Sequence, residues 1–323
     1  MRAAYITEVG PAENITIGDL AEPTPGPTDV LVRTQAMAVN HVDTFVRAGT
    51  YPVPMTFPFV VGRDLVGTVA AVGAAVTDFR VGEPVWCNSL GYGGRQGSFA
   101  EYANVPGDRL YLLPAGVEPV PAVALLHTAA TAYLGLFREA QLRYGETVLV
   151  SGAAGGVGSA VVQLAAAAGA TVIATARDDD ADWCRACGAS EVVDYRDPDL
   201  WTKVAAAAPG GIDVFWENST HYAFEHTLPL LARGGRFIVI AGRQALPSLP
   251  IGQLYVNDAS LRGFVISNAS AADLADAARA VNRGLADGVL RASVAAELPL
   301  AEAADAHRQL EAGATRGRIV VVP

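Results

Sequence analysis

A stretch of small residues between two apolar runs is the part of this sequence whose residue types best suit chemistry. Positions 148–177 read VLVSGAAGGVGSAVVQLAAAAGATVIATAR, which predicts a buried strand, a tight turn, a helix and a second strand. Ala153, Gly155 and Gly158 stand at the three small positions of a G-x-G-x-x-G turn. Small side chains there let the backbone approach a pyrophosphate, whose charge the free amides of the helix N-terminus stabilise. We therefore predict a dinucleotide site.

The turn itself should contact the pyrophosphate, through the backbone of Ala154, Gly155, Gly156 and Val157. A glycine turn also arises from packing alone, but here a strand precedes it, a helix follows it and the second strand ends at the expected distance. No Gly-Lys-Ser or Gly-Lys-Thr follows the glycines. This excludes a Walker A loop and the phosphoryl transfer that such loops support.

The end of the second strand distinguishes between the two nicotinamide cofactors. Folds that bind NAD place a carboxylate roughly 20 residues past the glycines to hold the ribose hydroxyls, whereas this sequence has Ala176 and then Arg177. A guanidinium suits the 2′-phosphate of NADPH and a carboxylate would repel it, so we expect NADPH. Asp178, Asp179 and Asp180 follow directly. In the alternative interpretation they cap the next helix while Arg177 pairs with one of them.

Further residues follow three later strands, at the edge where ligands bind in parallel sheets. Tyr195 follows the third strand and could lie against the adenosine or be a packed surface tyrosine. Asn218, Gly242 and Arg243 follow the next two strands. We expect these residues to line the cofactor, although Arg243 could instead reach solvent.

The elements that position these residues change in character near position 122. Residues 1–120 are rich in Val, Gly and Pro with short alternating runs, which predicts mostly β structure. Beyond 122, apolar strands alternate with Ala-rich helical stretches, a pattern typical of a parallel sheet covered on both faces. The expected strands lie near 147–151, 171–175, 191–193, 212–217, 235–240, 261–266 and 318–323, and the expected helices near 156–168, 181–187, 199–207, 221–231, 271–287 and 301–312.

Length and composition indicate a two-domain globular protein. Its 323 residues, of which 51% are hydrophobic and 17% charged, can bury a large core. The net charge of -10, from 23 basic and 33 acidic residues, gives no overall field that would attract nucleic acid or an anionic membrane. We see neither an N-terminal apolar leader nor a run of the roughly 18 to 20 uncharged apolar residues that spans a bilayer. We expect a cytoplasmic protein with no nucleic-acid or membrane partner.

The three cysteines, Cys87, Cys184 and Cys187, are too few for a disulfide framework and fit a reducing compartment. Cys184 and Cys187 form a CxxC motif, but they lie in a predicted helix with no second pair to complete a zinc site. We therefore interpret them as packed thiols, and redox or metal use is the weaker alternative.

Four segments carry a resemblance to a known superfamily. They read VNHVDTFVRAGTY at 39–51, GRDLVGTVAAVG at 62–73, GSFAEY at 97–102 and GAAGGVG at 152–158. With them the chain resembles the medium-chain dehydrogenase/reductase superfamily, and within it the zeta-crystallin and quinone oxidoreductase branch. The resemblance extends over nearly the whole sequence, and the first segment is specific to that branch.

This resemblance implies an α/β protein with two domains. A GroES-like, mostly β substrate domain would comprise residues 1–121 and 263–323, and a Rossmann domain with a doubly wound parallel sheet would comprise residues 122–262. It also implies a ligand cleft between the domains and, commonly, a homodimer.

The related alcohol dehydrogenase branch carries a catalytic zinc, so the positions of its ligands matter. Here Asn40 stands at the cysteine position, Arg63 at that of the histidine in Gly-His-Glu, and His127 near the third ligand. One possible ligand cannot hold a catalytic zinc, which requires three from the protein. The four cysteines of the structural zinc lobe are replaced by the short loop NSLGYGGRQGS at 88–98. The resemblance therefore implies metal-free chemistry.

The resemblance also assigns the residues beside the reacting atoms. Asn40 would point its amide toward the nicotinamide and donate to a substrate carbonyl as charge develops, unless it bonds only the backbone. Tyr51 matches one tyrosine of the quinone pocket, whereas the other is replaced by Phe45, which removes one donor. Thr131 matches a threonine that contacts the nicotinamide ring. Its alternative role is to bond the backbone of its own helix.

No general acid stands out. His127 and Asp43 are candidates, but we interpret them as a packed histidine and a solvated aspartate. Three functions stay open: an NADPH:quinone reductase, an NADPH-dependent reductase of activated C=C bonds such as enones, and a non-catalytic NADPH-binding protein of the crystallin kind. RNA binding, which the resemblance also brings into view, is disfavoured by the acidic charge. No G-x-S-x-G elbow supports a hydrolase.

Overall fold

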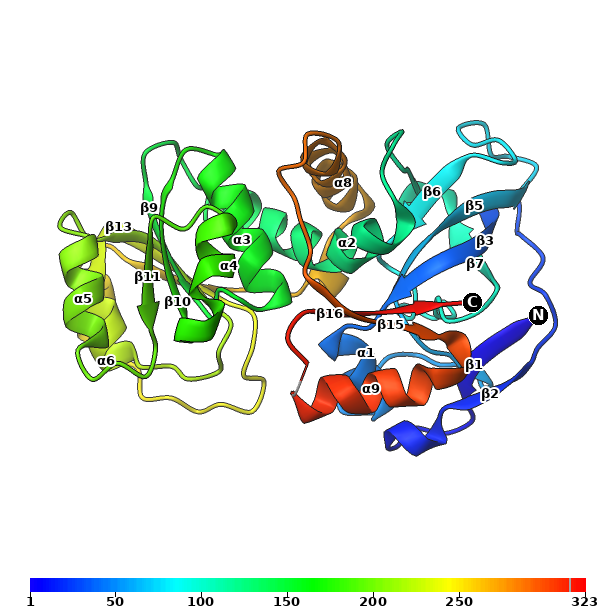
Figure 1. The fold of residues 1–323 in the computed structure, drawn as a ribbon, viewed down its shortest axis with the longest axis horizontal. Coiled ribbons are helices and arrows are strands. Elements are labelled where there is room, and N and C mark those ends of the chain that lie inside the picture. Colours follow the sequence, from blue (N-terminus) through cyan, green and yellow to red (C-terminus); the bar gives the residue numbers. More distant parts are fainter. Residues whose placement is uncertain (314) are drawn as a thin grey trace. The chain divides into compact units, whose positions relative to one another are not determined.

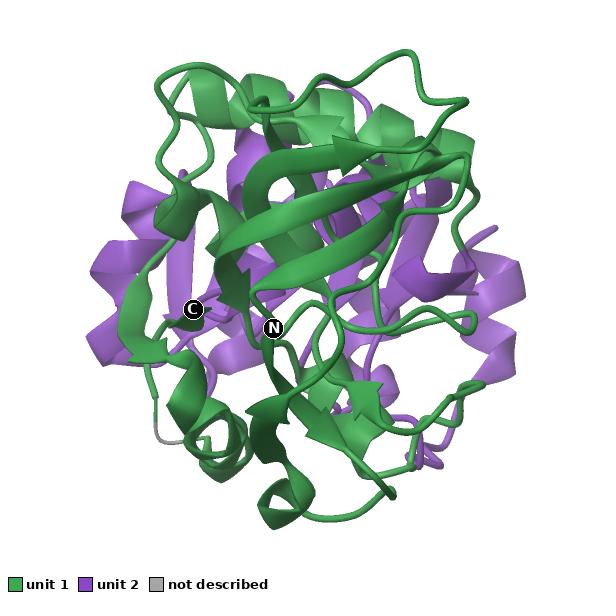
Figure 2. Ribbon diagram, turned by 90° about the vertical axis from the view of Figure 1, so that its right-hand side faces the viewer, with its two compact units in different colours: residues 1–127, 269–323 green, residues 128–268 purple. Residues whose placement is uncertain are grey.

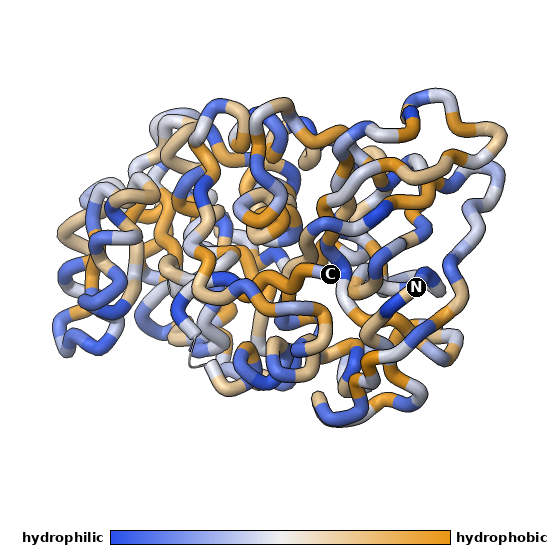
Figure 3. The backbone as a smooth tube through the Cα atoms, turned by 45° about the vertical axis from the view of Figure 1, so that its right-hand side comes forward, coloured by the Kyte–Doolittle hydropathy of each residue, from blue (hydrophilic) through white to orange (hydrophobic). Residues whose placement is uncertain are grey.

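The computed structural model describes residues 1–313 and 315–323 and divides into two compact units (Figure 2). Unit 1 comprises Met1–His127 and Ala269–Pro323, and unit 2 comprises Thr128–Asn268. Each unit has its own cluster of buried apolar side chains. Figure 3 shows that apolar and hydrophilic stretches alternate along the chain.

Unit 2 is built on a six-stranded parallel sheet (Figure 1). Its spatial order is β11-β10-β9-β12-β13-β14, so the strand order reverses between β9 and β12. Ligands bind outside the carboxyl ends of the strands at such a switch point. The strands are β9 (Thr147–Ser151), β10 (Thr171–Ala176), β11 (Glu191–Asp194), β12 (Ile212–Glu217), β13 (Leu231–Val239) and β14 (Ser260–Gly263).

Helices cover this sheet because its central strands are apolar on both faces. Val148, Leu149 and Val150 of β9 are all completely buried, which requires a layer on each side of the sheet. α3 packs against β9 and β10, and α4 packs against β10 and β11 (Figure 1). The predicted doubly wound parallel sheet is confirmed. The helices of unit 2 are α3 (Gly156–Ala167), α4 (Ala181–Ala186), α5 (Leu200–Ala207), α6 (Phe224–Thr227) and α7 (Ile251–Val256).

Unit 1 holds two sheets whose strand pairs are mostly antiparallel. One sheet has the order β2-β1-β4, and the other has the order β15-β16-β3-β5-β6-β8, with β7 also paired to β3. The predicted mostly β character of this region is confirmed. The strands are β1 (Arg2–Ile6), β2 (Thr16–Asp19), β3 (Asp29–Ala38), β4 (Phe59–Val60), β5 (Asp64–Val72), β6 (Pro84–Cys87), β7 (Tyr102–Pro106), β8 (Tyr111–Leu112), β15 (Val294–Pro299) and β16 (Arg318–Val322).

Helices of unit 1 have recognisable start and stop signals. α8 begins after Ser270, whose hydroxyl accepts a hydrogen bond from the amide of Asp273 at 3.1 Å, an N-cap that stabilises a helix start. α9 ends at Gly313, whose φ of +63° is left-handed, as the sequence indicates. α9 packs against α1 and β16. The helices are α1 (His41–Arg47), α8 (Ala271–Ala286), α9 (Ala303–Ala312) and α2 (Pro119–Tyr133), which begins in unit 1 and ends in unit 2.

The helix predicted at 221–231 is wrong in its length. It is reduced to α6 and a 3-10 turn at Leu228–Leu230. Pro229 has no amide hydrogen and so cannot continue the helical ladder. β13 already begins at Leu231, four residues before the predicted strand start.

Two other predicted elements are shorter than expected. The strand predicted at 261–266 is β14, which ends at Gly263 and is followed by a 3-10 turn. The helix predicted at 301–312 starts at Ala303, also after a 3-10 turn. The sequence did not predict α1, α7 or β15, because segments of six or seven residues are too short for a helical or strand period to stand out.

One helical stretch corrects the expectation about apolar runs. Pro119–Glu139 is 21 residues long and is apolar enough, by length and composition, to cross a membrane. The expectation that no such run exists is therefore wrong. His127 and the neighbouring threonines interrupt the apolar pattern without adding a formal charge. In the window concerned, 78% of the residues are buried within the protein, and buried core helices of globular proteins have the same length and composition.

Candidate active site

The glycine turn of unit 2 lies between the end of β9 and the start of α3 (Figure 1). Gly152 has a φ of +66°, a left-handed conformation that favours glycine. At Gly158 a Cβ atom would lie 2.2 Å from the carbonyl oxygen of Gly152 and 2.8 Å from Cα of Ala153, so a larger residue would force the turn apart. Gly155 is the N-cap of α3 and is exposed. The turn is therefore closed against its own helix, and the helix N-terminus is open, which suits a pyrophosphate.

The other residues predicted in this turn surround the same N-terminus. Ala154, Gly156 and Val157 are all partly exposed, so a ligand can approach their backbone. The first turn of α3, which the structure describes completely, carries no acidic residue. An anion would therefore meet the positive end of the helix dipole without a competing carboxylate.

Asn218 lies beside the glycine turn, and its side-chain amide already has protein partners. Its Nδ2 donates to the carbonyl oxygen of Ser151 at 2.9 Å, and its Oδ1 accepts from the indole nitrogen of Trp216 at 2.9 Å. The bond to Ser151 ties the end of β12 to the end of β9, from which the turn departs, and the bond from Trp216 holds the Asn218 side chain against its own strand. Asn218 therefore supports the turn, and its contact with the cofactor stays a prediction.

A buried carboxylate at the same sheet edge was missed from the sequence. Glu217, the last residue of β12, is 2% exposed and accepts a hydrogen bond from the amide of Ser219. Burial raises the pKa of Glu217, and the hydrogen bond from Ser219 opposes that rise. The signal for it was an acidic residue directly after the apolar residues VFW at 214–216, at the position where a parallel strand meets its ligand edge.

Arg177 follows β10 and pairs with one of the three aspartates after it. Its Nε donates to Oδ2 of Asp180 at 3.2 Å, and 40% of the arginine side chain is exposed. Asp180 is also the N-cap residue of α4, but it makes no side-chain capping bond. The pairing that the alternative interpretation expects is therefore observed, between Arg177 and Asp180. Ala176, the last residue of β10, is buried.

Tyr195 follows the neighbouring strand β11 and lies close to the end of β10. Its amide donates to the carbonyl oxygen of Ala176 at 3.2 Å, and half of the residue is exposed. The guanidinium of Arg196 lies 5.5 Å from the centre of the Tyr195 ring. Arg196 also pairs with Asp194, whose pKa is lowered mainly by hydrogen bonds from backbone amides. An exposed ring and two arginines thus stand at the ends of adjacent strands.

The remaining predicted residues of unit 2 occupy different surroundings. Thr131 is 6% exposed on α2 and is buried within the protein. Gly242 follows β13 with a φ of +74°, and a Cβ there would lie 2.8 Å from the ring of Tyr222. Arg243 is exposed. Gly242 therefore has a steric reason to be glycine, while the roles of Thr131 and Arg243 toward a cofactor stay predictions.

Asn40 stands in unit 1 at the centre of a buried polar cluster. Its Nδ2 donates to Oδ2 of Asp64 at 2.9 Å, and its Oδ1 accepts from Arg318 at 2.6 Å. Its backbone amide donates to Oδ2 of Asp43 at 2.8 Å, which sets the start of α1. Asn40 thus bonds charged side chains through its own side chain, rather than the backbone alone.

The charges of this cluster lie almost entirely out of solvent. Asp64 is completely buried, and Asp43 and Arg63 are 3% and 2% exposed. Burial raises the pKa of Asp43 to about 6. Burial, together with the nearby charge of Asp43, raises the pKa of Asp64 to about 8. The interpretation of Asp43 as a solvated aspartate is therefore wrong, because α1 turns its side chain back onto the N-cap amide.

Two cluster members, Asp64 and Arg318, were missed from the sequence. A signal existed for Asp64. It stands beside Arg63 and directly before the apolar residues of a predicted strand, in GRDLVG. Because charged residues are rarely buried unless they are paired, this pattern indicated a paired, buried carboxylate. Arg318 gave no comparable signal. Its bond to Asn40 joins positions 278 residues apart, and pairing over such a distance depends on the tertiary fold.

His127 is confirmed as a packed histidine. It is 9% exposed, and its Nδ1 lies 3.9 Å from Oδ1 of Asp64. Burial lowers the pKa of His127 to about 3, so its ring is neutral. Among the described residues, no three His, Cys, Asp or Glu side chains are grouped so that they could hold a metal ion. Metal-free chemistry remains a prediction. It rests on Asn40 and Arg63, which stand at two of the three positions that hold the catalytic zinc in the alcohol dehydrogenase branch.

Tyr51 is linked to this cluster by Tyr92, whose ring lies near both the Tyr51 ring and the Arg63 guanidinium. Its ring is stacked on Tyr92, with ring centres 6.3 Å apart, and the guanidinium of Arg63 lies 5.3 Å from the Tyr92 ring centre. Phe45 is 49% exposed.

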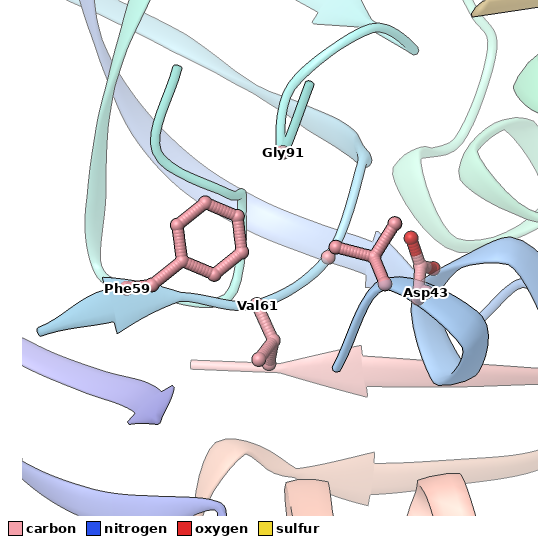
Figure 4. A pocket seen from close by; sticks show the side chains of 6 residues that line it. Asp43, Phe59, Val61 and Gly91 are labelled. Atoms are coloured by element: carbon pink, nitrogen blue, oxygen red, sulfur yellow. The ribbon is translucent and has the colours of Figure 1, made fainter. Parts of the chain in front are cut away.

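A small pocket of about 190 Å³, part of it open to solvent, is lined by Asp43, Val46, Phe59, Val61, Gly62 and Gly91 (Figure 4). It is too narrow to admit a water molecule.

Two family models match parts of the chain. The one described as zinc-binding dehydrogenase matches residues 156–283, and the one described as alcohol dehydrogenase GroES-like domain matches residues 26–115. The first begins at Gly156, the first residue of α3 after the glycine turn, and the second covers Asn40, Tyr51, Asp43 and Asp64.

Full-length relatives agree with these matches. The quinone oxidoreductase of Lama guanicoe is 32% identical over 326 residues, which cover 100% of this chain and 97% of the relative. A solved structure of an NAD-dependent alcohol dehydrogenase has a TM-score of 0.91 and 32% identity, with 100% of both chains covered. A solved mycobacterial protein complexed with NADPH has a TM-score of 0.87 and 28% identity, again with 100% of both chains covered. The likeness thus extends over both units and is not confined to one motif.

Proposed function

Because the chain belongs to the quinone oxidoreductase branch of the medium-chain dehydrogenase/reductase superfamily, we propose that it is an NADPH-dependent reductase of quinones. Its family membership identifies it as an oxidoreductase. The glycine turn before α3 is the observation that carries the proposal, because Gly158 leaves no room for a Cβ and Gly155 opens the helix N-terminus. That shape suits a dinucleotide pyrophosphate.

The proposed cofactor contacts come mainly from unit 2. The backbone of residues 154–157 would hold the pyrophosphate, Arg177 the 2′-phosphate, and Tyr195 the adenosine. Thr131 would contact the nicotinamide ring. Asn218 and Gly242 would line the cofactor, and Arg243 would reach a phosphate. When bound, NADPH supplies the hydride, and the protein orients the reactants and polarises the acceptor.

The choice of NADPH is supported by the side chain that follows β10. Arg177 offers a cation where a carboxylate would select the ribose hydroxyls of NAD, and its ion pair with Asp180 is partly exposed. Exposed pairs contribute little, about 0–1 kcal/mol. A doubly charged phosphate can therefore compete for the guanidinium. Relatives differ in this property, since one solved structure contains NADPH and another is of an NAD-dependent enzyme.

The proposed substrate contacts come from unit 1. Asn40 and Tyr51 would donate hydrogen bonds to the quinone oxygen, which gains charge during reduction, and donors placed in advance stabilise that charge. We propose that residues 1–121 and 263–323 form the substrate domain and that residues 122–262 form the cofactor domain. A cytoplasmic location fits the three cysteines, which are all free thiols and buried.

The proposed macromolecular partner is a second copy of this chain. β14 is one of the two edge strands of its sheet, and edge strands present unpaired backbone groups that pair readily with another strand. Large apolar side chains on or near β14 and α7 are exposed. They are Leu246, Ile251, Tyr255, Val256 and Leu261. An isologous contact through this edge would cover them.

The experiment that tests the function follows NADPH absorbance with purified protein and a panel of ortho-quinones, para-quinones and enones. Rapid oxidation with quinones is the expected result. Oxidation with enones alone would favour a reductase of activated C=C bonds. Tight NADPH binding without oxidation by any acceptor would indicate a non-catalytic binding protein.

A further inference from the structure

The side-chain amide of Asn40 is held at both ends by charged residues from different parts of unit 1. Oδ1 accepts from Arg318 at 2.6 Å, and Nδ2 donates to Asp64 at 2.9 Å. We propose that Arg318 is a positioning residue that acts through Asn40, by fixing which end of the amide faces the substrate. The proposal rests on the proposed function in so far as Asn40 contacts the substrate.

The fold places Arg318 beside Asn40 through backbone pairing. β16 pairs with the end of β3, with Val320 opposite Ala38 and Val321 opposite Met37. The amide of Val39 donates to the carbonyl oxygen of Ile319 at 3.1 Å. The two strands are antiparallel, so Arg318, the residue before Ile319, lies next to Asn40, the residue after Val39. This register is specified because a slip by one residue would turn Arg318 to the other face.

The guanidinium of Arg318 is itself anchored. Its Nε donates to the carbonyl oxygen of Ala124, in α2, at 3.0 Å, while a terminal nitrogen reaches Asn40. The planar guanidinium holds these donors in a fixed fork. Arg318 thus joins β16, α2 and the N-terminus of α1, and it transmits their positions to one amide oxygen.

Arg318 permits only one orientation of the amide. A flipped amide would place its NH₂ against the guanidinium, where two donors meet and no hydrogen bond can form. Such a flip would leave buried donors without an acceptor, which is unfavourable. In the observed orientation Asp64 accepts from Nδ2. Nδ2 has two hydrogens and Asp64 takes one of them. The direction of the second hydrogen is therefore fixed, and this is the donor available to a substrate oxygen.

A double-mutant cycle tests the proposal in the full-length protein. The variants are Arg318→Met, Asn40→Ala and the double variant, assayed for quinone reduction at saturating NADPH. Arg318→Met should lower kcat about tenfold and change NADPH affinity by less than about twofold, because the cofactor contacts lie elsewhere. The double variant should lose no more kcat than Asn40→Ala alone. Losses that multiply would show that Arg318 acts independently of Asn40 and would overturn the proposal.

A second readout does not depend on catalysis. In protein labelled with ¹⁵N-asparagine, the side-chain NH₂ signals of Asn40 are assigned by their absence in Asn40→Ala. Arg318→Met should lower their protection from hydrogen exchange at least about tenfold, since the amide loses its anchor. The surface control Arg308→Met, which removes contacts with Glu13 and Asp305, should leave them unchanged. Unchanged protection in Arg318→Met would contradict the proposal.

The two readouts separate this proposal from the proposed function. If the wild-type protein oxidises no NADPH with any quinone, the proposed function fails while the exchange result still reports on the amide. If Arg318→Met does not fold, Arg318→Lys keeps the positive charge but replaces the rigid fork by a single ammonium. The lysine variant should lose both kcat and amide protection, and wild-type values for both would overturn the proposal.

Discussion

Arg177 donates from Nε to Oδ2 of Asp180 at 3.2 Å, directly after strand β10. The pair places a carboxylate beside the cation that we assign to the 2′-phosphate of NADPH. Both groups are close to solvent, with side-chain exposures of 40% and 17%. We therefore expect the pair to modulate cofactor choice, because the aspartate would compete with a bound 2′-phosphate for one guanidinium.

The first prediction concerns this competition. Arg177→Asp should weaken NADPH binding at least about tenfold more than NADH binding, since a carboxylate repels the phosphate but can hold ribose hydroxyls. The matched variant Asp180→Asn should tighten NADPH binding and leave NADH nearly unchanged. Fluorescence titration of the wild-type protein and both variants gives the dissociation constants for NADPH and NADH that test this prediction. Equal losses for both cofactors in Arg177→Asp would refute the phosphate assignment.

The second prediction concerns the closed shape of the glycine turn. Gly158→Ala would place a Cβ 2.2 Å from a backbone oxygen, and overpacking of this kind costs about 1–3 kcal/mol. NADPH affinity and the melting temperature should both fall. The control is Gly252→Ala in α7, where a Cβ meets nothing within 4 Å and helix propensity favours alanine. Wild-type affinity in Gly158→Ala would show that the turn does not form the binding surface.

The third prediction uses His307, which is completely buried in α9. Within the described residues neither of its ring nitrogens has a hydrogen-bond partner. Burial lowers the pKa of His307 to about 3. A depressed histidine pKa favours the folded state above pH 6.5, and this contribution is lost as the pH falls toward 3. The cost reaches about 2 kcal/mol at pH 5.

His307→Leu removes this titration and the unpaired ring nitrogens together. Urea unfolding should therefore show a gain in stability that is larger at pH 5 than at pH 8. The exposed His226, on α6, provides the control His226→Leu, which reports the effect of a leucine at the surface. A gain of the same size at both pH values in His307→Leu would contradict the neutral, buried state of the ring.

The fourth prediction concerns Asp64, whose pKa burial raises to about 8. A raised carboxyl pKa favours the folded state below the unfolded value near 3.8, and this contribution is lost as the pH rises through 8. Asp64→Asn keeps an oxygen that can accept from Asn40 but does not ionise. The loss of stability between pH 5 and pH 9 should be smaller in this variant, by a few kcal/mol.

Chemical denaturation at both pH values checks this expectation. The control is Asp276→Asn on α8, an exposed aspartate paired with Arg279, which should change the pH dependence little. If Asp64→Asn and the wild-type protein lost stability in parallel, Asp64 would be ionised already at pH 5.

The fifth prediction concerns self-association through strand β14. Leu261 lies on this edge strand and is 39% exposed, so Leu261→Glu places a charge in the proposed contact. Sedimentation should give about twice the chain mass of 33.5 kDa for the wild-type protein and the single-chain mass for the variant. Val81→Glu, at an exposed site in unit 1, should remain dimeric. A wild-type monomer at micromolar concentration would contradict the proposed contact.

Most of unit 2 could be predicted because its signals are local. The strands β9 to β12 and the helices α3 and α4 repeat a simple alternation, and their bounds differ from the prediction by at most one residue. Arg177, Tyr195 and Asn218 could be predicted to lie at the ends of parallel strands because such strands end at a common edge, and their contact with a cofactor stays a prediction. The helix predicted around Pro229 failed where a single residue without an amide hydrogen outweighed the surrounding helix propensity.

The buried cluster of unit 1 could be predicted only in part. Asn40 was found from a motif, but the partners of its side chain, Asp64 and Arg318, are 24 and 278 residues away. Asp43 was misread because α1 has only seven residues, too few for a helical period to reveal the helix start that turns the Asp43 side chain inward. The state of a buried charge depends on tertiary neighbours, and a local pattern does not contain them.

The most direct measurement is an equilibrium titration of the purified wild-type protein with NADPH and with NADH, followed by tryptophan fluorescence. The account predicts saturable binding of both cofactors, with NADPH bound at least about tenfold more tightly. No binding of either cofactor would contradict it.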